Sequence, residues 1–87
     1  MRDNKDANRF ELEVDGGIVF ANYRRSETSV LITHVEAPMR LRGTGAAARL
    51  MQEIATNARE TGVKLRPLCS YAAVWFRRNR SFADVLA

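Results

Sequence analysis

Two glycines and two arginines in the middle of the chain have the types and spacing of an anion-binding loop. Gly43 and Gly45 are two residues apart, Arg40 and Arg42 lie just before or at the start of the loop, and three alanines then open a helical pattern. Glycine allows positive φ and lets a ligand approach main-chain N–H groups, and the first turn of a helix has unpaired N–H donors. A phosphate could bind there, with the arginines as further donors. The alternative is an ordinary turn followed by a helix with Thr44 as its N-cap residue.

The only cysteine, Cys69, lies between a predicted strand and a predicted helix. A thiol at a helix N-terminus can be activated as a nucleophile, and Arg66 is nearby in the sequence. The alternative is that Cys69 is a small buried apolar residue. Because a single cysteine cannot form an internal disulfide, its use fits a reducing, cytoplasmic location.

Three further side chains could transfer protons. His34 and Glu36 are two residues apart in an extended segment and share one face, so either could accept a proton as a general base. Alternatively, His34 is a hydrogen-bonded residue at the sheet edge and Glu36 is solvated. Tyr71 could donate a proton to a departing group, or it could belong to the buried stripe of its helix.

Extended segments precede the glycine loop. Residues 9–15 alternate between apolar and charged side chains, and Asp15-Gly16 predicts a tight hairpin that returns through residues 18–24. Residues 28–36 are apolar on both faces, which is typical of a central strand. In this segment the alternation predicts Val30 and Ile32 on one face and Leu31, Thr33 and Val35 on the other.

The second half of the chain predicts a strand–helix–strand unit. Residues 44–61 have a helical apolar stripe, Gly62 is a natural helix stop, and residues 63–68 are again extended. This connection requires a parallel strand pair. Ser70 could cap a second helix over residues 71–79, after which the last residues fold back. The expected fold is α+β, in the order β-β-β-α-β-α, with a mixed four-stranded sheet.

Length and composition indicate one globular domain. The chain has 87 residues, 46% hydrophobic and 28% charged. Residues 1–8 are expected to be a flexible tail and residues 9–87 the domain. The net charge of +4 indicates an anionic partner, and no apolar run is long enough to span a bilayer. No metal site is expected.

Three motifs together resemble one family. Residues 40–46 read Arg-x-x-Gly-x-Gly-Ala, which resembles the pyrophosphate-binding signature of the GNAT (N-acetyltransferase) superfamily. Residues 33–38 (THVEAP), and residues 67–71 (PLCSY) followed by VWFRRN, resemble a miniature single-domain branch of that superfamily. In one place the chain departs from the branch, with Arg80-Ser81-Phe82 after Asn79 where the branch usually has a proline.

This resemblance implies that acetyl-coenzyme A binds between two splayed parallel strands. Val35 and Glu36 would meet the amides of its pantetheine arm, and Arg40 and Arg42 would lie beside its pyrophosphate. The thioester would lie near His34, Glu36 and Cys69. The loop would offer the pyrophosphate the main-chain N–H groups of Gly43, Thr44, Gly45 and Ala46.

The implied function is a minimal acetyltransferase that moves an acetyl group to an amine, directly or through acetyl-Cys69. The acceptor is unknown, and either a monomer or a homodimer is possible. One alternative is a basic nucleic-acid-binding module in which Phe20 and Tyr23 stack on bases, although the acidic first strand disfavours it. Another is a coenzyme-binding partner subunit without turnover.

Overall fold

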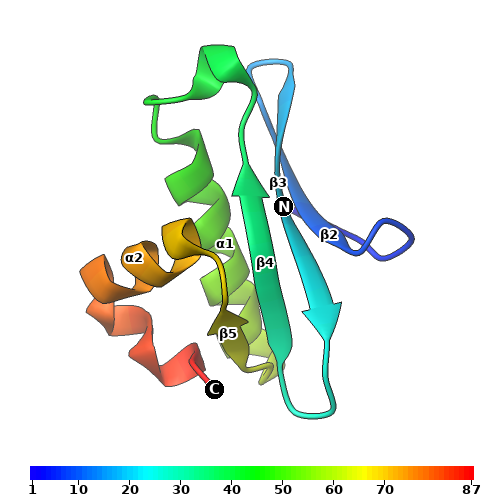
Figure 1. Ribbon diagram of the computed structural model, residues 1–87, viewed down its shortest axis with the longest axis vertical. Helices are drawn as coiled ribbons and strands as arrows, with labels where there is room; N and C mark the ends of the chain where they lie inside the picture. The colour runs from blue at the N-terminus through cyan, green and yellow to red at the C-terminus, as the bar shows by residue number, and fades with distance from the viewer.

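The computed structural model describes all 87 residues and contains one mixed sheet of five strands. Four antiparallel strands follow one another in the sheet, and a short parallel strand completes it beside the fourth (Figure 1). The strands are β1 (Arg2–Asn4), β2 (Arg9–Val14), β3 (Gly17–Arg25), β4 (Val30–Glu36) and β5 (Leu65–Pro67).

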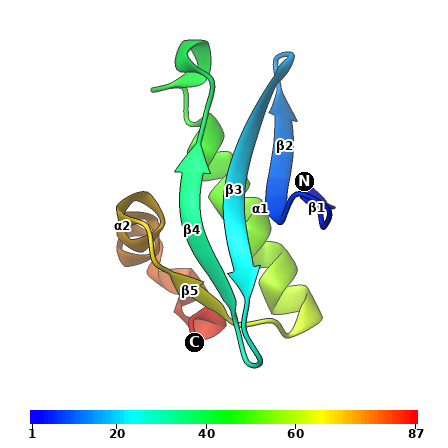
Figure 2. The same ribbon diagram turned by 45° about the vertical axis from the view of Figure 1, so that its right-hand side comes forward.

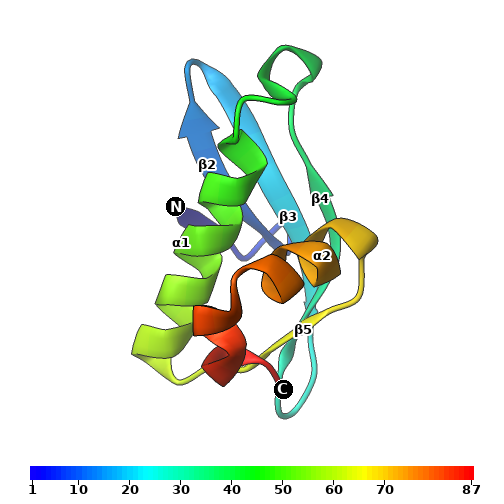
Figure 3. The ribbon, with the colours of Figure 1, turned by 90° about the vertical axis from the view of Figure 1, so that its left-hand side faces the viewer.

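The 3₁₀ turn η1 (Met39–Leu41) leads to α1 (Ala46–Thr61), and α2 (Ser70–Arg78) leads to η2 (Arg80–Val85). Helices α1 and α2 and the turn η2 lie on one side of the sheet, whereas η1 lies beyond the end of β4 (Figure 1). Helix α1 packs on β2 and β3, whereas α2 packs on β4 and β5 (Figure 3). No helix covers the opposite face of the sheet (Figure 2).

The core fills the space between the sheet and the helices. The most completely buried side chains come from the inner face of the sheet, from α1 and from η2, and burial of this apolar surface is the main stabilising term. They are Val19, Ile32, Leu50, Met51, Ile54, Leu65 and Val85.

The hairpin and the parallel pair predicted from the sequence are confirmed. Asp15 and Gly16 both have positive φ, 48° and 78°, as a two-residue hairpin turn requires. Strands β4 and β5 are parallel and are joined through α1. The pair separates after Ile32, because β5 ends at Pro67 while β4 continues to Glu36.

The predicted strand count is corrected at the N-terminus, within the segment expected to be a tail. Residues 2–4 form β1, which pairs with β2 and gives the sheet a fifth strand. Three side-chain contacts hold β1 in place: the Tyr23 hydroxyl donates to Asp3 at 2.5 Å, Arg25 pairs with Asp3 at 3.1 Å, and the Asn4 Nδ2 donates to Glu11 at 3.1 Å. The N-terminal segment has no apolar pattern, so its polar anchoring could not be read from alternation alone.

The helix starts also differ from the prediction. Helix α1 begins two residues late, with Gly45 rather than Thr44 as its N-cap residue. Helix α2 is capped by Cys69 rather than Ser70, and Tyr71 is 43% exposed instead of belonging to the buried stripe. The predicted stop at Gly62 is confirmed, with φ of 77°.

A bulge interrupts β4 in the middle. Tyr23 pairs with Ile32 but Asn22 pairs with His34, so Thr33 is an extra residue in β4. An extra residue of this kind bends the strand and reverses the side-chain alternation beyond it.

The bulge moves Val35 to the inner face of the sheet. Val35 lies opposite the buried Ala21 and packs against the core, so its predicted grouping with Leu31 and Thr33 is wrong. Glu36 lies opposite Phe20, and with His34 it is on the face that no helix covers.

Candidate functional site

A groove of about 500 Å³ lies where β4 runs past the end of β5. One wall is the last part of β4, the other is the loop leading into α1, and the first turn of α2 contributes Tyr71. Figure 1 shows that this loop and the start of α2 both lie beside β4. The lining residues are 34–37, 41–43, 45–47 and Tyr71.

On its β5 side, the main chain of β4 forms hydrogen bonds only as far as Ile32. The Val30 N–H donates to the Lys64 carbonyl at 2.9 Å, and the Ile32 carbonyl accepts from the Leu68 N–H at 2.9 Å and from the Cys69 N–H at 3.3 Å. Beyond Ile32 no residue of β5 reaches β4.

The hydrogen-bonding pattern of β3 shows in which direction the main-chain N–H and C=O groups of β4 point beyond Ile32. The hairpin closes with Val14 opposite Gly17, so the odd-numbered residues of β3 bond to β2 and the even-numbered residues bond to β4. The bond from the Tyr23 N–H to the Asn8 carbonyl at 2.9 Å agrees with this pattern.

As a result, Val35 directs its main-chain groups into the groove. His34 and Glu36 lie opposite Asn22 and Phe20, the even-numbered residues, and turn their own groups toward β3. Val35 lies between them, so its N–H and C=O point to the side where β5 is absent. The groove therefore has a short free strand edge, which an extended amide chain could pair with.

The start of α1 forms the second wall and is rich in free donors. Gly43 and Gly45 have φ of 78° and 86°, and no side chain caps the helix. Its first main-chain bond runs from the Arg49 N–H to the Gly45 carbonyl at 3.0 Å, so the N–H groups of residues 46–48 have no helical partner. No acidic side chain lies in the first turn, which leaves the positive end of the helix dipole unopposed.

The glycines leave this helix end open. A Cβ at Gly43 or Gly45 would meet no atom within 4 Å, so a methyl group would fill space from which a ligand can approach the amides. The residues present therefore fit a diphosphate. Thr44 does not share this role, because its N–H and its hydroxyl both donate to the Leu41 carbonyl, at 3.3 Å and 2.5 Å.

The two predicted arginines have different positions. Arg42 lines the groove, and its Nε donates to the Ala37 carbonyl at 3.4 Å. Arg40 does not line the groove: its Nη2 donates to the Asp15 carbonyl at 2.8 Å and ties η1 to the β2–β3 hairpin.

His34 and Glu36 form a pair at the edge of the groove. The His34 Nε2 and the Glu36 Oε1 are 3.1 Å apart, and the two side chains are 53% and 49% exposed. They are placed to exchange a proton with a group that approaches from the uncovered face of the sheet.

Cys69 is half-buried outside the groove lining and serves as the cap of α2. Its Sγ accepts a hydrogen bond from the Ala72 N–H at 3.4 Å, and its own N–H bonds to β4. The thiol therefore lies at a helix N-terminus, as predicted, and it also has a structural role there.

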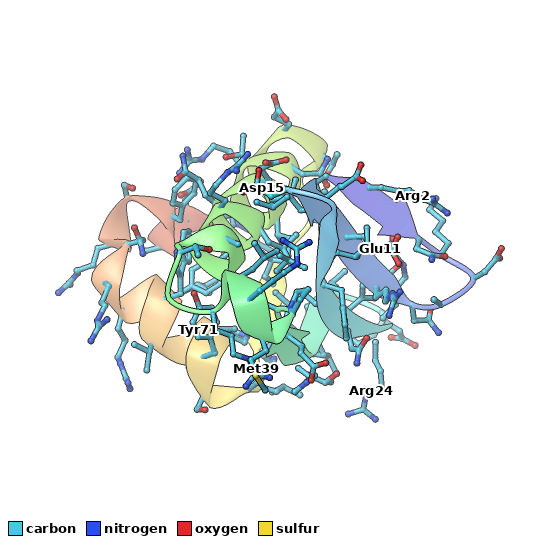
Figure 4. All side chains as sticks on the ribbon, turned by 90° about the horizontal axis from the view of Figure 1, so that it is seen from above. Arg2, Glu11, Asp15, Arg24, Met39 and Tyr71 are labelled. Atoms are coloured by element: carbon cyan, nitrogen blue, oxygen red, sulfur yellow. The ribbon has the colours of Figure 1, made fainter.

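Tyr71 is the lining residue whose place was missed, since the helical pattern assigned it to the core. Its ring closes the groove at the start of α2, and partial burial raises the pKa of its phenol above the ordinary value of 10.0. The view from above shows Tyr71 beside the start of α1 (Figure 4). The sequence signal for its place at the site was that Tyr71 follows Cys69 by two residues in PLCSY.

A second hollow of about 360 Å³ continues from the groove between α1 and α2. It shares Gly45 and Tyr71 with the groove and adds Arg49 and Arg78, together with the Trp75 ring. Neither arginine takes part in any of the five ion pairs of the chain.

No helix in the chain has the length and apolar character required to cross a membrane. Residues 9–85 match the family model described as GCN5-related N-acetyl-transferase. A similar solved structure is the NMR solution structure of a GCN5-like protein from Staphylococcus aureus, with 19% sequence identity and a TM-score of 0.63 over 93% of this chain and 90% of that one. A comparison with curated protein sequences found no significant match.

Proposed function

The chain belongs to the GCN5-related N-acetyltransferase family, and from that premise we propose that it binds acetyl-coenzyme A in the β4–α1 groove and transfers the acetyl group to an amine. The supporting observation is that one groove combines a free strand edge at Val35 with an uncapped, glycine-entered helix start. Acetyl-coenzyme A has amides in its pantetheine arm, which suit the strand edge, and a pyrophosphate, which suits the helix start.

In this proposal the N–H groups at Gly43 and Gly45 and in the first turn of α1 hold the pyrophosphate, with Arg42 beside it. Val35 pairs with the pantetheine amides, and the role predicted for Glu36 in that pairing passes to Val35. Arg40 and Thr44, which bond elsewhere, position the loop instead.

The hollow between α1 and α2 suits the nucleotide end of the coenzyme. Arg49 and Arg78 there are free to bind the 3′-phosphate, and Trp75 offers an apolar surface. Of the three arginines near the end of α2, only Arg78 faces this hollow, since Arg77 and Arg80 line a different one.

Bound acetyl-coenzyme A would supply a thioester whose carbonyl carbon an amine can attack. His34 or Glu36 would accept the proton of the amine, from the uncovered face of the sheet. Tyr71 would protonate the departing sulfur, because a phenol is protonated at neutral pH; partial burial raises its pKa further. Cys69 offers an alternative route in which the acetyl group passes first to its thiol.

The nucleic-acid alternative required Phe20 and Tyr23 to be free to stack on bases, and neither ring is free. Tyr23 is only 2% exposed, and Phe20 is covered by the Arg9 guanidinium at 4.4 Å from its ring centroid. Free aromatic rings that could stack on bases are therefore missing from the sheet positions that the alternative requires.

Thermal unfolding with and without acetyl-coenzyme A tests the proposal. At a ligand concentration of about 100 times Kd, binding adds about 2.7 kcal/mol, which raises Tm by roughly 10 °C or more for a domain of this size. Release of free coenzyme A with a panel of amines then separates an enzyme from a binding subunit. A salt-sensitive rise in Tm with RNA and none with acetyl-coenzyme A would overturn the proposal.

A further inference from the structure

A third hollow lies on the far side of α2 from the coenzyme groove. It has a volume of about 520 Å³ and an apolar floor formed by Ala73 and Phe76 of α2 and by Leu86 from the C-terminal segment. Phe76 is almost fully buried, whereas Ala83 is exposed at the rim.

Two arginines that form no ion pair line this hollow. Arg77 and Arg80 line it, are exposed, and take part in none of the five ion pairs of the chain. Acidic residues are absent from its lining. The hollow therefore combines an apolar floor with uncompensated positive charge, which suits a ligand that has carboxylates next to apolar side chains.

The spacing along α2 separates this hollow from the coenzyme site. Tyr71, Trp75 and Arg78 are on the helix face toward α1, while Phe76 and Arg77 are on the face turned to η2. No residue lines both hollows.

We propose that this hollow is a docking site for an acidic peptide segment of a partner protein, with its carboxylates on Arg77 and Arg80 and an apolar side chain on Phe76 and Leu86. Small-molecule sites bury most of the ligand surface, whereas exposed residues form much of this rim, as in a peptide-binding groove. The site is independent of coenzyme binding.

The test uses the full chain and the peptide acetyl-Glu-Leu-Glu-Phe-Glu-amide, with its glutamine counterpart as the neutral probe. Amide chemical shifts should change at Ala73, Phe76 and Ala83 and stay unchanged at Gly43 and Gly45. R77Q/R80Q should weaken binding by about fivefold to tenfold, the effect of two partly exposed ion pairs.

The matched control is R2Q/R24Q, which removes the same charge from exposed positions remote from the hollow; Arg2 and Arg24 lie on the side of the protein away from α2 (Figure 4). This variant should bind within twofold of the parent. Equal weakening by both double variants, equal binding of the glutamine peptide, or shifts confined to the coenzyme groove would overturn the proposal. So would binding to phosphatidylserine-containing vesicles, lost in R77Q/R80Q, with no binding of either peptide.

Discussion

Gly43 and Gly45 have positive φ angles for which other residues would be strained, and both border open space at the start of α1. The sequence could predict positive φ at this pair, because glycine between a strand and a helix is typical of a turn that other residues cannot adopt without strain. It could not predict that Thr44 is bonded inside the loop or that Arg40 reaches the Asp15 carbonyl. Those contacts depend on how η1 meets the hairpin, which is set by tertiary packing.

Replacing Gly45 with alanine should reduce coenzyme binding and stability together. The positive φ costs about 1 kcal/mol for a residue with a Cβ, and the added methyl should weaken acetyl-coenzyme A binding by at least about tenfold by disturbing hydrogen bonds to a charged group. Gly62→Ala is the matched control, since Gly62 also has positive φ, 77°, with open space around it, at the other end of α1. Calorimetric titration should show normal affinity in G62A, and equal loss in both variants would contradict the proposed site.

Substitutions at Cys69 should separate its two roles. Cys69→Ser keeps a side-chain acceptor for the Ala72 N–H, so the protein should stay as stable as the parent, whereas Cys69→Ala should lose roughly 0.5 kcal/mol as the cap is removed. If the acetyl group passes through the thiol, mass spectrometry will detect an acetyl adduct in the parent and none in C69S. Full turnover in C69S would show that transfer is direct.

Among the elements, the bulge in β4 has the largest effect on the site. A strict alternation over residues 28–36 predicts Val35 on the outer face, and the extra residue at Thr33 reverses this. Bulges arise from strand pairing across the sheet and have no local signature here. The hairpin and α1 could be predicted because a two-residue turn and a helical stripe are local patterns.

Amide hydrogen exchange should report the free strand edge directly. The Val35 N–H points into the groove, so in the free protein it should exchange much faster than those of His34 and Glu36, which bond to β3. Acetyl-coenzyme A should slow exchange at Val35 and leave the other two little changed. Slow exchange at Val35 in the free protein would contradict the assigned register.

The Arg59–Asp84 ion pair, a clamp between α1 and η2, should make the stability of the fold depend on pH. Arg59 donates to both carboxylate oxygens of Asp84, at 2.9 Å and 2.7 Å, and these bonds hold the pKa of Asp84 below its usual 3.8. A lowered folded-state pKa stabilises the fold above the unfolded-state pKa, and the contribution disappears as pH falls through the lower value. Asp84→Asn should therefore lower Tm at pH 7, and the difference should vanish in strong acid.

The control for the clamp is Asp6→Asn, at an exposed turn position without a hydrogen-bond partner. Its Tm should match that of the parent at every pH. A D84N variant as stable as the parent at pH 7 would show that the clamp contributes nothing measurable, as many exposed ion pairs do.

For the molecule as a whole, the sheet is covered on one face only, and the groove opens at the end where β4 runs past β5. The α+β class and the parallel pair could be predicted, because the order of segments allows few topologies. The exposed position of Tyr71 could not be predicted from the sequence, because it depends on the angle at which α2 leaves the sheet. The net charge of +4 favours an anionic ligand without choosing among anions.

The most direct test of the central claim is an NMR titration of the protein with acetyl-coenzyme A, following every backbone amide. Saturable binding should shift the amides of Val35, Gly43 and Gly45 and the first turn of α1, and should leave β1 and the β2–β3 hairpin unchanged. Shifts that do not saturate, or that appear away from the groove while these amides stay in place, would contradict the assignment of the coenzyme to this site.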